Sequence, residues 1–108
     1  MRLRRGRFDE LVERQLALLA EDEASLFEEA MEAEAAWARS GREEAEEAYG
    51  DFQLVVDAIA DRLLEIREAY AATLDSHAAE EYRSAFHRAV SRRLRRYPSV
   101  ASDLDPEP

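Results

Sequence analysis

The stretch AEEAYGDFQLVVDAIADRLLEIREAYAATL, residues 45–74, decides the fold. Its apolar residues recur at alternating steps of three and four, which is the spacing of a heptad repeat along one face of a helix. The residues of this stripe are Ala45, Tyr49, Phe52, Val56, Ile59, Leu63, Ile66, Tyr70 and Thr73. Ala48, Val55 and Ala60 widen the stripe, so a single neighbouring helix does not cover it. The pattern therefore predicts a long central helix flanked by two others.

The breaks on either side of this helix divide the chain into three helical segments. Gly41 lies at the first break, Asp75 is a good N-cap at the second, and no proline precedes Pro98. Glu21, Asp22 and Glu23 interrupt the apolar stripe of the first segment, but no helix breaker accompanies them, so we expect that helix to be continuous. The predicted helices span residues 8–38, 42–74 and 76–97 of one domain, 1–98, and a flexible acidic tail spans 99–108. Short loops predict an up-down-up three-helix bundle.

Composition restricts the class of protein. The 108 residues carry a net charge of −10, contain no cysteine, and are 46% hydrophobic and 37% charged. Disulfides and thiolate metal sites are excluded, and the balance is typical of a soluble helical domain. No apolar run approaches the roughly 18 residues of a membrane span, and no apolar segment follows the basic Met1–Arg7. We expect a cytoplasmic protein that binds neither membrane nor nucleic acid, because an acidic body repels a polyanion.

The third predicted helix is about ten residues shorter than the other two, so part of the first two helices stays uncovered. An exposed apolar surface of this kind favours self-association, with coiled-coil packing, or binding to another protein. We therefore expect a homodimer. The expected interface residues are Leu16, Leu19, Leu26, Phe27, Trp37, Tyr49 and Phe52.

Charge is segregated along the chain. Residues 9–47 contain 14 acidic residues and three arginines, whereas residues 82–97 contain six arginines and no acid. On a helical wheel Arg93 falls in line with the apolar positions of its helix, facing the seam between helices. We predict that Arg93 pairs there with Asp22 or Glu29 and that this ion pair fixes the register of the helices.

A cluster of carboxylates is the strongest chemical candidate. Glu29 and Glu32 lie on the first predicted helix, and Glu47 and Asp51 lie at the start of the second, at the same level of the hairpin. Four carboxylates that converge could bind Mg²⁺, which prefers hard oxygen ligands and bridges phosphates.

These carboxylates carry a resemblance to a known family. The pattern Glu-Glu-x-x-Glu at residues 28–32, the run EAYGDFQLVV at 47–56 and the basic RRLRRY at 92–97 resemble the MazG-type all-α nucleoside triphosphate pyrophosphohydrolases. The chain departs from the family pattern at Ala48, where the family has a glutamate. The resemblance implies a Mg²⁺-dependent hydrolase in which Glu29, Glu32, Glu47 and Asp51 bind the metal and Arg93 contacts phosphate.

A second resemblance concerns the fold. The runs YGDFQLVVD at residues 49–57 and LDSHAAEEY at 74–82 are similar to those of small uncharacterised helical proteins of GC-rich bacteria, which implies no activity. Two hypotheses remain. The first is a non-enzymatic helical interaction or scaffold module without a cofactor, and the alternative is the Mg²⁺-dependent hydrolase.

Overall fold

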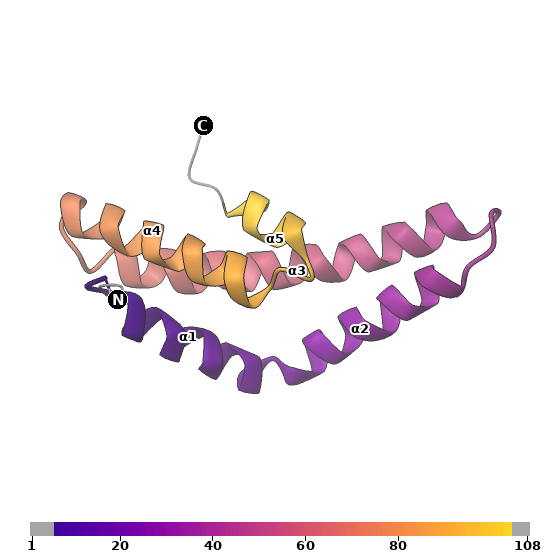
Figure 1. Ribbon diagram of the computed structural model, residues 1–108, viewed down its shortest axis with the longest axis horizontal. Coiled ribbons are helices and arrows are strands. Elements are labelled where there is room, and N and C mark those ends of the chain that lie inside the picture. The colour runs from indigo at the N-terminus through magenta and orange to yellow at the C-terminus, as the bar shows by residue number, and fades with distance from the viewer. Residues whose placement is uncertain (1–5, 105–108) are drawn as a thin grey trace, which may run out of the picture.

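The computed structural model describes residues 6–104, and within that range the chain forms five α-helices and no strand (Figure 1). The helices are α1 (Asp9–Asp22), α2 (Ala24–Arg39), α3 (Ala45–Ala71), α4 (Ser76–Arg93) and α5 (Pro98–Asp103). The predicted all-helical class and the long middle helix are confirmed. None of the described helices combines the length and the apolar character needed to cross a membrane.

The middle of the heptad stripe forms the buried face of α3, whereas Tyr49 near its start is 44% exposed. Phe52, Val56, Ile59 and Leu63 are all buried, since α3 lies between α2 and α4 and its apolar face meets both. The helix covers 27 residues. Asp75 caps the next helix as predicted, because its side chain accepts a hydrogen bond from the backbone N–H of Ala78 at 2.8 Å.

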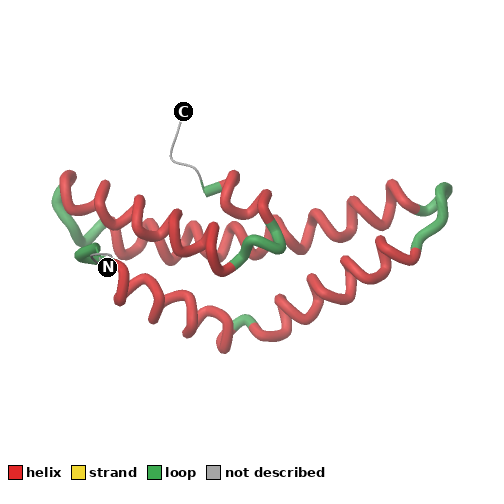
Figure 2. The backbone as a smooth tube through the Cα atoms, in the orientation of Figure 1, coloured by secondary structure: helices red, strands yellow, loops and turns green. Residues whose placement is uncertain are grey.

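The prediction of one continuous helix over residues 8–38 is wrong, because the chain breaks at Glu23. This residue has φ −111° and ψ 33°, and Figure 2 shows the short loop that separates α1 from α2. Three consecutive acids disfavour the carbonyl end of a helix, where the dipole is negative. The Glu23 carboxylate also accepts a hydrogen bond from Arg62 of α3 at 2.7 Å. The break lets α1 pack against α4 while α2 packs against α3.

The prediction of a flexible tail over residues 99–108 is wrong for the part that the structure describes. Pro98 begins α5, where its missing N–H and preset φ suit a first helical position. Val100 and Leu104, four residues apart, are fully buried against the core. Residues 105–108 lie outside the described residues.

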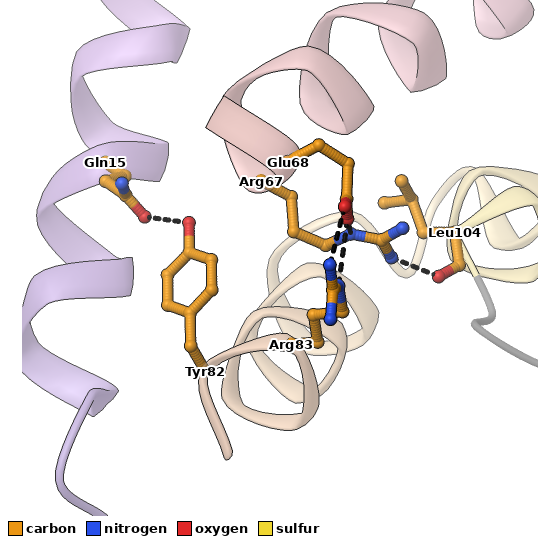
Figure 3. Close-up of polar contacts among 6 residues, drawn as sticks. All are labelled: Gln15, Arg67, Glu68, Tyr82, Arg83 and Leu104. Atoms are coloured by element: carbon orange, nitrogen blue, oxygen red, sulfur yellow. Dashed lines mark hydrogen bonds and ion pairs between the residues drawn. The ribbon is translucent and has the colours of Figure 1, made fainter. Parts of the chain in front are cut away.

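A polar cluster holds α5 in place (Figure 3). The Arg67 side chain is only 8% exposed, and it donates to Glu68 at 2.7 Å and to the backbone carbonyl of Leu104 at 2.5 Å. Arg83 of α4 donates to both oxygens of Glu68, at 3.0 and 2.7 Å. Hydrogen bonds from Arg83 and Arg67 lower the pKa of Glu68 to about 2. One carboxylate thus joins α3 to α4, and its arginine neighbour joins α3 to α5.

A partly buried hydrogen bond between two side chains joins α1 to α4. The ring of fully buried Tyr82 packs against Phe8, Tyr70 and Phe86, and its hydroxyl donates to Gln15 at 2.8 Å (Figure 3). Burial raises the pKa of Tyr82 to about 12, so the hydroxyl keeps its proton.

The helices do not close into one uniform bundle. The principal extents are 50 × 33 × 26 Å and the radius of gyration is 15.8 Å, whereas a compact domain of this size has about 13 Å. In Figure 1, α1, α4 and α5 lie along one part of α3, and the end that carries the α2–α3 loop extends beyond them. Within the described chain, α2 packs closely on α3 and meets α1 at the break, but has no close helix contact with α4 or α5.

Candidate functional site

The α2–α3 hairpin carries most of the exposed large hydrophobic side chains of the described chain. We call residues 24–57 the arm; it comprises α2, the connecting loop and the first part of α3. Six large hydrophobic side chains are exposed in the described chain: Leu18, Met31, Trp37, Tyr49, Leu54 and Leu64. Four of the six belong to the arm. Single exposed apolar residues are ordinary, but their concentration on one element indicates a contact surface.

One flank of the arm is hollowed between α2 and α3. We call this depression of about 510 Å³ the arm groove. Its lining is Glu29, Glu32, Ala33 and Ala36 from α2, and Ala48, Asp51, Leu54 and Val55 from α3. Ala33, Ala48 and Val55 are half-buried, whereas Leu54 is 70% exposed. The groove therefore has an apolar floor, an exposed leucine and three carboxylates.

The structure brings together three of the four predicted metal ligands. Glu29, Glu32 and Asp51 line the arm groove, and Glu47 does not. Among residues 6–104, no group of three acidic or histidine side chains is arranged so that it could hold a metal ion. The magnesium site remains a prediction from the sequence.

Arg93 pairs with a different carboxylate from the one predicted. Its Nε lies 3.1 Å from one oxygen of Glu13, and Arg92 lies 2.6 Å from the other. Asp22 is exposed, and neither it nor Glu29 is the partner. The reason is the break at Glu23. Because of this break, α1 and not α2 packs along α4, and Glu13 of α1 lies beside the C-terminal end of α4. Arg93 borders an apolar pocket of about 260 Å³ whose lining excludes the acids of the arm groove.

The other flank of the arm carries aromatic rings. The Trp37 ring stacks on Phe52 with centroids 5.7 Å apart, and Tyr49 meets Trp37 edge-on at 4.8 Å. Tyr97, from the segment between α4 and α5, contacts Phe52 at 6.0 Å. Trp37 and Tyr49 remain 38% and 44% exposed. This flank thus presents partly open aromatic side chains over a buried phenylalanine.

The predicted interface residues divide into three groups. Leu16, Leu19 and Phe52 are buried in the core of this chain and are not available to a partner, because α4 and the segment after it cover them. Leu26 and Phe27 are half-buried, and Trp37 and Tyr49 are exposed.

Leu54 is the residue that the sequence reasoning missed. It lies on the polar side of the α3 wheel, opposite the heptad stripe, among Asp51, Asp57 and Asp61. A large apolar residue on the polar face of an amphipathic helix was the signal that could have identified it.

The arm holds most of the net charge. Residues 24–57 contain ten acidic residues and two arginines, a net charge of −8 out of −10. The ion pairs of the described chain lie mostly elsewhere. Glu34, paired with Arg96 at 2.8 Å, is the only acidic residue of the arm with an ion-pair partner among residues 6–104. Glu29, Glu32 and Asp51 are therefore uncompensated within that range.

Comparisons with protein-family models, with curated proteins and with solved structures find no match for this chain. The site must therefore be interpreted from its own chemistry.

Proposed function

We propose that this chain is a non-enzymatic helical module that binds another protein through the arm. The observation that carries the proposal is the arm itself, since four of the six exposed large hydrophobic residues of the described chain lie on it and its helix α2 has no close contact with α4 or α5. Trp and Tyr are enriched at protein interfaces, where they supply large contact areas at a small cost in conformational entropy. Trp37 and Tyr49 provide such side chains on one flank, and Leu54 provides an anchor on the other.

Burial elsewhere supports the same assignment. Most aromatic and aliphatic residues of α1 and α4 are buried in the core, although Leu18 is exposed, and the four arginines of α4 form ion pairs with Glu68, Asp9 and Glu13. The arm keeps four large apolar side chains exposed, and among residues 6–104 all of its carboxylates except that of Glu34 are without an ion-pair partner. The homodimer, the cytoplasmic location and the Mg²⁺-dependent hydrolase remain predictions from the sequence.

Site-specific photocrosslinking tests the proposal. The photoreactive residue p-benzoylphenylalanine replaces Leu54 in the arm or Leu18 on α1, which is also exposed, at 54%. In cells that produce the protein, we expect a discrete adduct from position 54 and none from position 18. When the irradiation is done in lysate instead, purified wild-type protein added beforehand should compete for the adduct, whereas the Leu54→Asp variant should not. Equal adducts from both positions, or none from position 54, would contradict the proposal.

A further inference from the structure

We propose that the partner presents a basic amphipathic helix and that this helix lies in the arm groove, between α2 and α3. The inference rests on the proposed function and specifies the chemistry of the partner. It depends on the shape of the groove, on its charge and on the pairing of the arginines elsewhere in the chain.

The floor of the groove suits a third helix. Ala33, Ala36 and Ala48 have small side chains, so the backbone of a partner helix can approach within the 8–10 Å axis separation of packed helices. On α2 the lining runs from Glu29 to Ala36, which is about 11 Å at the helical rise, or two turns. A partner helix would therefore contribute apolar residues at positions i, i+3 or i+4, and i+7, which is the usual pattern for a helix bound in a groove. Leu54, which also lines the groove, would contact the same apolar face of the partner helix.

The charge of the groove selects a cation-bearing helix. Glu29, Glu32 and Asp51 are exposed, and no ion pair within residues 6–104 neutralises them. They lie in an arm of net charge −8. This charge would repel an acidic helix, and a neutral helix would leave the three carboxylates without a counter-charge. Arginine or lysine side chains flanking the apolar stripe of the partner would pair with these carboxylates. An inorganic cation alone would leave Leu54 exposed.

A second copy of this chain does not supply the basic helix that the groove requires. Its arm carries the same charge, and like charges at an interface oppose association. Three of the four arginines in its basic segment, residues 92–97, are already engaged, since Arg92 and Arg93 pair with Glu13 and Arg96 pairs with Glu34. The occupant that fits best is therefore a helix from another protein.

Fluorescence anisotropy with designed peptides tests this inference on the full-length chain. The probe is a labelled 18-residue peptide with leucine and alanine on one helical face and lysine and arginine on the other. One control peptide has the same composition in scrambled order, and another replaces every basic residue with glutamate. We expect the basic amphipathic peptide to bind at least about tenfold more tightly than either control. Its affinity should fall as salt is raised from about 50 to 300 mM, because screening weakens charge pairing.

Two pairs of variants locate the binding site. Leu54→Asp and Ala36→Trp should each weaken binding about tenfold or more, the first by removing the apolar anchor and the second by filling the groove. The matched controls, Leu18→Asp and Ala38→Trp, change exposed residues outside the groove lining and should stay within about twofold of wild type. Leu54→Asp adds negative charge, so a loss of affinity for a basic peptide identifies an apolar contact. Circular dichroism checks that all four variants keep their helical content.

The outcomes distinguish this inference from the proposed function. Equal binding of the glutamate peptide, or no binding of the basic one, overturns the partner chemistry, and the crosslink at position 54 then decides whether the arm is still a binding surface. If Leu54→Asp and Ala36→Trp both bind the basic peptide with wild-type affinity, the arm groove is not the binding site. Tight binding of the scrambled peptide would show that charge attraction alone explains the affinity, and it would overturn the inference that the partner binds as an amphipathic helix. Loss of the crosslink at position 54 overturns the proposed function itself.

Discussion

At the scale of single residues, Arg67 is the most constrained charged side chain in the described structure. It is the one buried charged residue among residues 6–104, and its guanidinium spans from Glu68 on its own helix to the carbonyl of Leu104 at the end of α5. A buried guanidinium is tolerated when its donors have partners, and here one of them is a carboxylate.

Replacing Arg67 tests how much this contact holds α5 on the core. Arg67→Met keeps the aliphatic stem but leaves the carbonyl of Leu104 without its donor, so we expect the free energy of unfolding to fall by about 1–3 kcal/mol. Urea denaturation followed by circular dichroism measures the loss. Arg95→Met is the control, because Arg95 is exposed and should cost less than about 0.5 kcal/mol. Equal losses in the two variants would show that the Leu104 contact contributes nothing.

Glu68 makes stability depend on acid pH. The hydrogen bonds from Arg83 and Arg67 lower its pKa from 4.5 to about 2, so folding favours the ionised carboxylate. Its stabilisation is complete above about pH 5 and is lost as the pH falls through 2, since the folded pKa lies below the unfolded one. We expect the urea midpoint of wild type to fall between pH 5 and pH 2 by more than that of Glu68→Gln. Glu21→Gln, a change at an exposed carboxylate of α1, should retain the wild-type pH dependence, and a flat profile in wild type would contradict the assignment.

At the scale of helices, packing partners decide where each helix ends. The acidic residues at 21–23 do not by themselves end a helix. Because α1 packs along α4 and α2 packs along α3, the chain must change direction between α1 and α2. The change of direction occurs at Glu23, whose carboxylate accepts a hydrogen bond from Arg62 of α3.

Gly50 lowers the stability of α3 relative to alanine at the same position. It lies inside the helix with ordinary helical backbone, and a Cβ at this position would meet no atom within 4 Å. Gly50→Ala should therefore raise the free energy of unfolding by about 0.5–1 kcal/mol, because alanine loses less backbone entropy on folding. Thermal unfolding followed at 222 nm would measure the gain. A lower midpoint in the variant would mean that this turn of α3 is not helical in solution.

At the scale of the whole molecule, shape and charge are unevenly distributed. The described chain outside the arm contains most of the buried core and most of the ion pairs, whereas the arm carries a net charge of −8 and most of the exposed large apolar side chains. Of the residues expected to form a homodimer, Trp37 and Tyr49 are the most exposed, at 38% and 44%, and both lie on this arm.

The homodimer can be tested through its salt dependence. If two copies pair through their arms, repulsion between the arms opposes association and salt screens it. A dimer of this kind predicts that the mass measured by light scattering after size exclusion rises from 12.4 kDa toward twice that value as NaCl is raised from about 50 to 500 mM. A mass of 12.4 kDa at every salt concentration would rule out the dimer, and a dimer that dissociates with salt would place its interface outside the arms.

The sequence by itself determined the helical class, the long α3 with its buried stripe, and the cap at Asp75. These features are local, because the periodicity of apolar residues and the identity of a capping residue act within a few turns of one helix. The carboxylates at 29, 32 and 51 could also be grouped from the sequence, since the two helices of a hairpin align by counting from their loop.

Only the tertiary structure decided which apolar residues would remain exposed. Leu16, Leu19 and Phe52 belong to the core and Leu54 does not, because burial depends on which distant segment packs over each face. Docking of α5 depends on a contact between Arg67 and Leu104, which are 37 residues apart, and the partner of Arg93 depends on a change of direction at Glu23. Such outcomes follow from the total free energy of packing, in which segments far apart in the chain compete for the same surface.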